Sequence, residues 1–422
     1  MWTEPGRPGV NASLLLAGLL LFAIGVAAQE GQYRSRILID PHSTLDQSTA
    51  LSVEELEQAL DALDDPYARS SAGRHLARHY LQQGDYDRAA DYYHGALAAE
   101  GLAPIANREM LRELGRVYLL QEDYPRAART LQQVMQFELA PDVPDYLLLA
   151  RALHGAGDYV AVVETLDRLR REHPELDAPA LRRAVALYYR VDAYVQCAAV
   201  LRQLLALEPE NAAAWHQLAA VYLLQDKRRE ALDQLSLARD KGTPFDERHT
   251  LLLADLQASE QAPFAAGNTL ELAIAGGDVQ GSGDNYRKLF EFWLQAREGE
   301  RAISALRQAA RLTGDTLLYL HLAQLLMERE KWQAMQDTVL SACGEQLEER
   351  HVGRANLLLG ISQLKLGDRG GARRSFNNAT LIGGANTAAA QGLRFMEAEP
   401  ATEQELRRIV SPCFGAGDKR SR

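Results

Sequence analysis

The sequence predicts an all-α fold, a solenoid built from repeated helical hairpins. Three observations lead to this prediction. Apolar residues recur at helical spacing through most of the 422-residue chain. A small apolar residue returns every 33 to 38 residues, and a second pair of apolar residues returns in step with it. Short polar turns, several of them marked by glycine and aspartate, separate the two halves of each unit.

Residues 211–244 show this unit most clearly, with two amphipathic segments on either side of a polar turn at residues 225–229. The apolar residues of the first segment are Trp215, Leu218, Ala219 and Tyr222, and those of the second are Ala231, Leu235 and Ala238. The small residues Ala219 and Ala231 lie where two helices must approach closely. The unit resembles the tetratricopeptide repeat (TPR), whose signature spans about 34 residues. Only the terminal proline is displaced, to Pro244.

The same unit recurs nine times along the chain. The small residues that open the successive second helices are Ala89, Ala127, Val162, Cys197, Ala231, Ala266, Ala302, Met335 and Ala372. In the first helices an apolar pair recurs in step, from Leu76-Ala77 to Leu359-Gly360. The resemblance therefore implies a right-handed TPR superhelical solenoid of about nine helix-turn-helix repeats over residues 70–387, closed by capping helices.

Glycine and aspartate mark the turns of several hairpins. The pairs are Gly84-Asp85, Gly157-Asp158 and Gly367-Asp368, and Glu122-Asp123 marks the turn of the second unit in the same way. Glycine suits the left-handed conformation that ends a helix, and the aspartate is predicted to cap the second helix. The sixth unit departs most from the pattern, because Gln257 replaces an aromatic residue and Pro263 lies at the turn.

The N-terminal residues 1–28 are predicted to be a signal peptide. An apolar run over residues 13–28 closes on small residues, so cleavage after Ala28 would release the protein into the periplasm without stable membrane insertion. The alternative is an uncleaved anchor in the inner membrane, because the run is close to the ~18 residues that span a bilayer. Residues 29–51 are polar and without periodicity, which predicts a flexible leader.

The ends of the array are predicted to carry capping helices. Ser52 is an expected N-cap for a helix over residues 53–63. Residues 388–398 and 402–410 have the pattern of closing helices, and the tail at residues 411–422 is expected to be disordered.

A glycine-rich link at residues 276–284 is predicted to divide the array into an N-terminal part, residues 52–282, and a C-terminal part, residues 283–410. The link is either a loop insertion that the fold tolerates or a hinge between the two parts.

Composition and motifs argue against several functions. The net charge of −11 and the pI near 5.5 argue against nucleic-acid binding. The sequence contains no phosphate-binding glycine loop and no nucleophile-elbow serine, so no enzyme activity, cofactor or small-molecule substrate is expected. His75 and His79 have metal-ligand spacing on one helix, but no glutamate follows the first histidine, which favours packing or surface roles over a metal site.

The exposed side of the first helices carries an informative charge pattern. In TPR arrays this side lines a concave groove that usually holds peptides, and in repeats one to four the lining positions carry basic and aromatic residues without an acid. The predicted partner-binding residues are Arg74, Arg78, Arg112, Arg116, Arg151, Arg182, Tyr189 and Arg190. Guanidinium groups hold carboxylates bidentately, so the groove is predicted to attract an acidic segment. The alternative is that these arginines only decorate solvated helix faces. Repeats six to eight present Asp255, Glu291 and Glu328 instead.

The sequence therefore predicts a non-catalytic periplasmic scaffold that binds protein or peptide segments in its groove. Residues 276–384, which include NYRKLFEFWLQ and ANLLLGISQLKLGDRGGARRSF, are also similar to exported TPR proteins encoded alongside TonB, ExbB and ExbD in some Gram-negative bacteria. That similarity implies an accessory role in energy-dependent outer-membrane transport, with TonB, ExbB or ExbD components as partners. The alternative is an envelope-assembly scaffold for pilus, polysaccharide or outer-membrane protein biogenesis.

Overall fold

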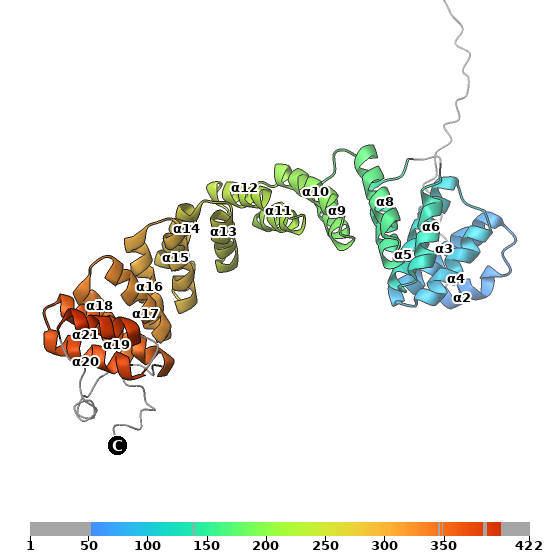
Figure 1. Cartoon of the computed structure of the whole chain (residues 1–422). Helices are drawn as coiled ribbons and strands as arrows, with labels where there is room; N and C mark the ends of the chain where they lie inside the picture. Colours follow the sequence, from blue (N-terminus) through green and yellow to red (C-terminus); the bar gives the residue numbers. More distant parts are fainter. Residues whose placement is uncertain (1–51, 138–139, 345–346, 348, 383–385, 398–422) are drawn as a thin grey trace, which may run out of the picture.

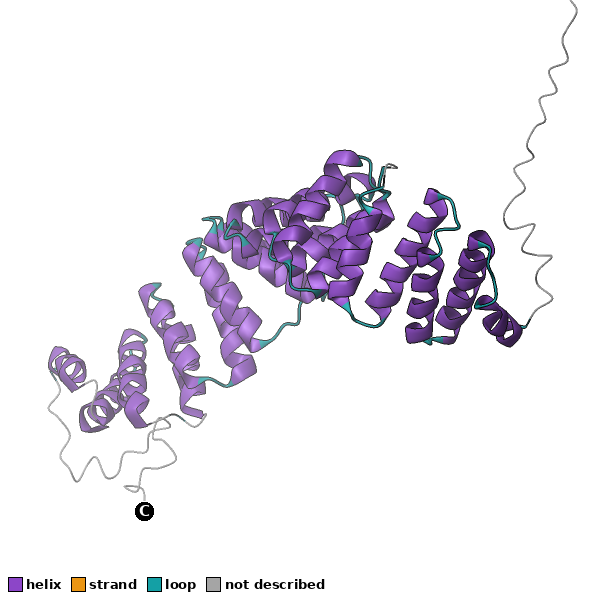
Figure 2. Cartoon of the chain, turned by 90° about the vertical axis from the view of Figure 1, so that its right-hand side faces the viewer, coloured by secondary structure: helices purple, strands orange, loops and turns teal. Residues whose placement is uncertain are grey.

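The computed structural model describes residues 52–137, 140–344, 347, 349–382 and 386–397, and every secondary-structure element within them is a helix (Figures 1 and 2). The predicted signal peptide, leader, second closing helix and tail lie outside these residues. Among the described helices, none combines the length and the apolar character that a bilayer crossing requires. The predicted all-helical solenoid is confirmed.

Nine helical hairpins follow one another along an extended, curved array, with α2 (Val53–Leu60) at one end and α21 (Asn386–Phe395) at the other (Figure 1). The first helices of the hairpins are α3 (Pro66–Gln83), α5 (Pro104–Leu120), α7 (Val143–Gly155), α9 (Ala178–Arg190), α11 (Ala212–Leu224), α13 (Glu247–Ser259), α15 (Gly283–Gln295), α17 (Thr316–Glu328) and α19 (Glu349–Lys365). The second helices are α4 (Tyr86–Ala98), α6 (Tyr124–Val134), α8 (Tyr159–Glu172), α10 (Tyr194–Leu207), α12 (Arg228–Asp240), α14 (Pro263–Gly276), α16 (Gly299–Thr313), α18 (Trp332–Gly344) and α20 (Arg369–Ile382).

One backbone conformation repeats in the turn of every hairpin. The turn residue has a positive φ at Gly84, Glu122, Gly157, Asp192, Asp226, Gln261, Arg297, Glu330 and Gly367. The predicted left-handed glycines are confirmed, and six other residues adopt the same conformation despite its steric cost. The residue that follows often caps the second helix, as at Asp85, Asp123 and Asp158, whose side chains accept a hydrogen bond from a backbone N–H of the first turn.

The predicted small residues of the second helices are buried in all nine hairpins, from Ala89 to Ala372. Two glycines in first helices show how close this packing is. A Cβ on Gly115 would lie 2.6 Å from Leu131 Cγ, and a Cβ on Gly360 would lie 2.6 Å from Phe376 Cδ1. The side chains of Leu131 and Phe376 therefore occupy the space that a larger residue would need.

The N-terminal helix α2 behaves as the second helix of a half repeat. Its cap is the predicted Ser52, which forms a capping box with Glu55. In three places, the hydroxyl of a tyrosine near the C-terminus of a first helix forms a hydrogen bond with a polar side chain of the preceding second helix. The pairs are Tyr118 with His94, Tyr188 with Asp167, and, between α3 and α2, Tyr80 with Glu57. The helix ends at Leu60, three residues earlier than predicted.

The buried apolar residues form three clusters along the array. The first runs from Ala77 to Leu256, the second from Ala254 to Leu359, and the third joins α20 to α21. The first and second clusters therefore meet on α13. Within the glycine-rich link, Val279 is only 1% exposed and belongs to the second cluster. The link is thus anchored in the core, and its role as a hinge stays a prediction.

Candidate partner-binding groove

The eight predicted groove residues all lie on first helices, as their positions in the repeat require. Arg74 and Arg78 are on α3, Arg112 and Arg116 on α5, Arg151 on α7, and Arg182, Tyr189 and Arg190 on α9. Arg116 and Arg151 occupy the same repeat position on consecutive first helices. The arginines fall into two sets, which differ in whether the chain itself supplies an acid to pair with them.

Arg74 and Arg78 share Glu113, which lies on the next first helix, α5. Arg78 Nη2 is 2.5 Å from Glu113 Oε1, and Arg74 Nη2 is 3.6 Å from the same oxygen. The Tyr93 hydroxyl donates to the other carboxylate oxygen at 2.9 Å. Burial acts to raise the pKa of Glu113, but the hydrogen bonds and charge of Arg78, with help from Tyr93 and Arg74, lower it overall. These contacts fasten α3 to α5.

Arg112 belongs to a buried cluster rather than to an open surface. Its Nε donates to Asp145 Oδ1 at 2.5 Å and its Nη2 to Asp142 Oδ2 at 2.9 Å, while Arg108 donates to Asp145 Oδ2 at 2.6 Å. The Arg112 side chain is 11% exposed and that of Asp145 1%. The prediction that Arg112 is exposed is therefore wrong. Asp142, the N-cap of α7, and Asp145, in its first turn, bring the start of α7 into contact with α5.

Burial and pairing oppose each other at Asp145. Burial acts to raise its pKa, and hydrogen bonds from Arg112 and from the Asp142 backbone N–H, together with the charges of Arg112 and Arg108, lower the pKa overall. The carboxylate stays ionised, as a buried pair requires. Sequence analysis missed Arg108, Asp142 and Asp145.

Arg182 is half exposed but is also paired. Its Nη2 lies 2.5 Å from Glu208 Oε1, and Glu208 accepts a further bond from Asn211, the N-cap of α11. Arg182 therefore connects α9 to the N-terminus of α11, the next first helix. The acids that pair with these arginines lie outside the lining positions considered from sequence. A search for opposite charges about one repeat apart would have found Arg78 with Glu113 and Arg112 with Asp145.

Arg116, Arg151 and Arg190 form the second set. All three are exposed, and none makes an ion pair or a side-chain hydrogen bond with any residue that the structure describes. Tyr189 is 42% exposed, and its ring meets that of Tyr194 edge to face with centroids 6.0 Å apart. We call Arg116, Arg151, Tyr189 and Arg190 the open arginine face. Its guanidinium groups are free to form bidentate bonds with carboxylates.

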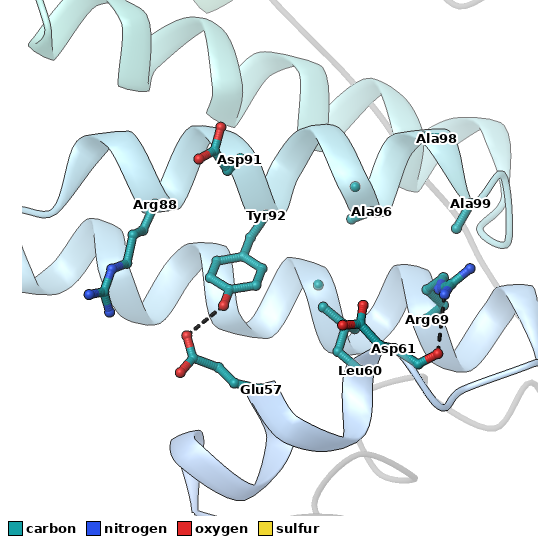
Figure 3. Close-up of a pocket in the computed structure, with 12 residues that line it drawn as sticks. Glu57, Leu60, Asp61, Arg69, Arg88, Asp91, Tyr92, Ala96, Ala98 and Ala99 are labelled. Carbon is teal, nitrogen blue, oxygen red and sulfur yellow. Dashed lines mark hydrogen bonds between the residues drawn. The ribbon is translucent and has the colours of Figure 1, made fainter.

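A cavity of about 790 Å³ lies beside α2, between that helix and the first hairpin (Figure 3). Small residues of α4, including Gly95 and Ala96, form part of its lining. Glu57 accepts a bond from Tyr92, and Arg69 donates to the Asp61 carbonyl, so these charged groups are bound within the chain. The described residues that line it include no serine, cysteine or histidine.

The two histidines with metal-ligand spacing do not form a metal site with other described residues. His79 shares a hydrogen bond with Gln83, and His75 is exposed. Within the part of the chain that the structure describes, no group of three or more histidine, cysteine or acidic side chains is placed to hold a metal ion.

Comparison with known proteins identifies the repeats. The family model of the tetratricopeptide repeat matches residues 74–102 and 111–145. These two segments thus match the tetratricopeptide repeat, and the other described hairpins share their turn conformation and buried small residue. Comparison with curated proteins gave no significant match.

Solved structures with similar helical arrays are distant in sequence. A tetratricopeptide repeat protein from Parabacteroides merdae is 17% identical, with 61% of this chain and 98% of that chain covered and a TM-score of 0.36. MamA from Desulfovibrio magneticus is 19% identical, with 40% and 93% covered and a TM-score of 0.31. Because these TM-scores are below 0.5, the fold assignment depends on the repeat geometry of the chain and on the family match.

Proposed function

We propose that the protein is a non-catalytic scaffold that binds an acidic protein segment along its first helices, centred on α5, α7 and α9. The observation that carries this proposal is the open arginine face. Five arginines of the same region, Arg74, Arg78, Arg108, Arg112 and Arg182, are neutralised by acids of the chain, whereas Arg116, Arg151 and Arg190 pair with no acid among the described residues. In a protein with a net charge of −11, this local excess of positive charge favours a negatively charged partner.

The chemistry of the open arginine face suits an extended carboxylate-bearing segment. Hydrogen bonds to charged groups contribute about 1.5–3 kcal/mol each when they form in a protected site. Arg116 and Arg151 recur at one position of successive repeats, so a segment that follows the array meets them in turn. The exposed ring of Tyr189 beside Arg190 offers an apolar contact at the α9 end.

A matched pair of charge-reversal variants tests the proposal. The triple variant Arg116→Glu, Arg151→Glu and Arg190→Glu reverses the open arginine face. The control, Arg129→Glu, Arg171→Glu and Arg202→Glu, reverses exposed, unpaired arginines on the second helices of the same three repeats. Binding of a poly-glutamate peptide, measured by fluorescence anisotropy at low salt, should fall at least tenfold (about 1.4 kcal/mol) for the first variant and little for the control. Equal losses in both variants would contradict the proposal.

The proposed compartment is the periplasm, and its support is the apolar run at residues 13–28 with small residues at its end. Fractionation of cells that express the full chain with a C-terminal tag tests this directly. Recovery of a shortened protein in the periplasmic fraction is the expected result. A full-length protein that remains with the inner membrane would favour the uncleaved anchor.

Within that compartment, the narrower proposal is an accessory role to the TonB–ExbB–ExbD system, supported by the similarity of residues 276–384 to exported TPR proteins of that kind. Cross-linking followed by affinity capture from the envelope would separate the two roles. Recovery of TonB, ExbB or ExbD supports the uptake role. Recovery of pilus, polysaccharide-export or outer-membrane assembly components without them supports the assembly scaffold instead.

A further inference from the structure

Two histidines stack against each other where the fifth and sixth repeats meet. The rings of His216, on α11, and His249, on α13, are 3.6 Å apart between centroids and 11° from parallel. Phe245, in the link between α12 and α13, packs edge-on against His216 with centroids 5.0 Å apart. Stacking at this distance favours neutral rings, because two protonated imidazoles so close together repel each other.

The two stacked rings have few hydrogen-bond partners among the described residues. His216 Nε2 is buried and has no hydrogen-bond partner among the residues that the structure describes. His249 Nδ1 lies 2.6 Å from Asp246 Oδ1, at the N-cap of α13. Protonation of His216 would therefore place a charge on a ring that has few polar groups around it to stabilise that charge.

The pair sits at the boundary between two parts of the core. On α13, Leu253 and Leu256 belong to the first apolar cluster, whereas Ala254 belongs to the second. Figure 1 shows α11 and α12 lying across the view and α13 standing more upright, so the array changes direction here. His216 also occupies a groove-lining position of the fifth repeat, next to the arginine-rich repeats. A change at this junction would alter how the two halves of the groove face each other.

The charged groups around the pair set the direction of its pH response. Asp246, whose Oδ1 lies 2.6 Å from His249 Nδ1, favours the protonated form of His216. On the side of α9, Arg182 is paired with Glu208. The end of α12 carries Arg239, which donates to Thr269, and the exposed Asp240 and Lys241. On the far side of α13, Glu247 accepts a hydrogen bond from Asn285 of α15.

Burial lowers the pKa of His216, the charge of His249 lowers it further, and Asp246 opposes both. Because the folded pKa lies below the ordinary value of 6.5, the stacked arrangement is fully stable above pH 6.5. It loses stability as the pH falls below 6.5 and through the lowered pKa of His216 in the folded protein.

We infer that the His216–His249 stack is a pH-sensitive joint, which holds the fifth and sixth repeats together at neutral pH and loosens on mild acidification. The inference rests on the proposed function only in its consequence, which is that acid changes the alignment of the groove for an extended partner. The joint itself is a property of the free protein, so it is tested without a ligand.

Hydrogen exchange of the full soluble chain at pH 7.5 and 5.5, corrected for the intrinsic effect of pH, provides the test. We expect exchange in α11 and α13 to rise at the lower pH by no more than about tenfold, because pH 5.5 lies one unit below the ordinary histidine value of 6.5. Helices α5 and α17, which lie in repeats distant along the chain, should change little. The variant His216→Phe keeps a stacked aromatic ring without a titratable group, and it should abolish most of the rise.

Two further variants make the result decisive. His249→Phe tests the other ring and replaces His216→Phe if that protein does not fold, as judged by circular dichroism. His154→Phe, a groove histidine that contacts Tyr159 rather than another histidine, should keep the wild-type rise. The inference is overturned if exchange in the wild type does not change between the two pH values. It is also overturned if the two stacking variants show the same rise as the wild type. If the rise is present but poly-glutamate binding is absent, the joint stands and the proposed function fails.

Discussion

The arginine-rich first helices α3 to α9 and the later first helices α13 to α19 have the same fold but present different chemistry. Both halves use ion pairs between neighbouring first helices, since Arg78 meets Glu113 in one half and Lys288 meets Asp255 in the other. At the repeat position of Arg116 and Arg151, however, the later half carries Asp255, Glu291 and Gln324.

The comparison separates two uses of charge in one architecture. Paired charges fasten successive repeats in both halves, so they belong to the fold. Unpaired arginines occur at exposed positions that the hairpin does not need for packing, so they are free to select a ligand. Function in a repeat protein is carried by such positions rather than by the fold itself.

The largest expected effect comes from removing the acid of the buried cluster. Asp145→Ala leaves Arg108 and Arg112 without their main partner in a buried site, and we expect a loss of about 3–5 kcal/mol from the N-terminal repeats. The matched change in the later half, Asp255→Ala, breaks a half-exposed pair with Lys288 and should cost only about 0.2–1 kcal/mol. Urea unfolding followed by hydrogen exchange of each half provides the measurement. Equal losses would show that the two ion pairs do not differ as their burial suggests.

Close helix packing should respond in the same way in both halves, which tests whether the fold is really shared. Gly115→Ala and Gly360→Ala each place a Cβ 2.6 Å from a buried side chain, and each should cost about 1–2 kcal/mol after the gain in helix propensity. Gly95→Ala is the control, because a Cβ there meets nothing within 4 Å, and it should stabilise α4 slightly. Thermal unfolding compares the three. A neutral result in only one half would indicate looser packing there.

Acid should unfold the N-terminal repeats before the later ones. The pKa of Glu113 and that of Asp145 are lowered, as described above, so each contributes stability that is complete above the unfolded values of 4.5 and 3.8. That contribution is lost as the pH falls below these values and through the lowered folded pKa. In the later half, the described carboxyls with a lowered pKa are Asp246, held mainly by the backbone N–H of His249, and Glu300, held mainly by Lys331. Both are exposed, so their loss should matter less. Hydrogen exchange between pH 5 and pH 2 should therefore show α5 and α7 opening before α15, and simultaneous opening of α15 would contradict this.

The sequence predicted the fold well because the repeat constrains each unit in the same way. The small residue of each second helix could be aligned from Ala89 to Ala372, and the fourth of these, Cys197, is buried as expected for a small apolar side chain. Turn positions were predicted where a glycine or glutamate before aspartate marked them, as at Gly84 and Glu122, but the left-handed Asp192 and Arg297 carry no such mark. Their conformation is imposed by the two helices that they join.

The candidate site was harder to predict because exposure depends on contacts between repeats. Repeat position alone placed Arg112 and Arg116 on the same side of one helix, but it could not show that Asp145 of the next repeat covers only the first. Long side chains reach across the repeat spacing, so an acid outside the lining positions can neutralise an arginine within them. The pairing is visible in the sequence only when charges are compared one repeat apart.

The smallest expected effect on stability is also the sharpest test of this distinction, because it concerns two arginines about one turn apart on α5. Arg116→Ala removes an exposed side chain without a partner among the described residues, and the free energy of unfolding should change by less than about 0.5 kcal/mol. Arg112→Ala removes a nearly buried group and leaves Asp145 with Arg108 and the Asp142 backbone N–H, so it should be clearly destabilising. Poly-glutamate binding should respond in the opposite order, since Arg116 is free to reach a ligand and Arg112 is not. If both substitutions weaken binding without a change in stability, the division of these arginines into fastening and ligand-binding sets is wrong, and the whole groove acts as one basic surface.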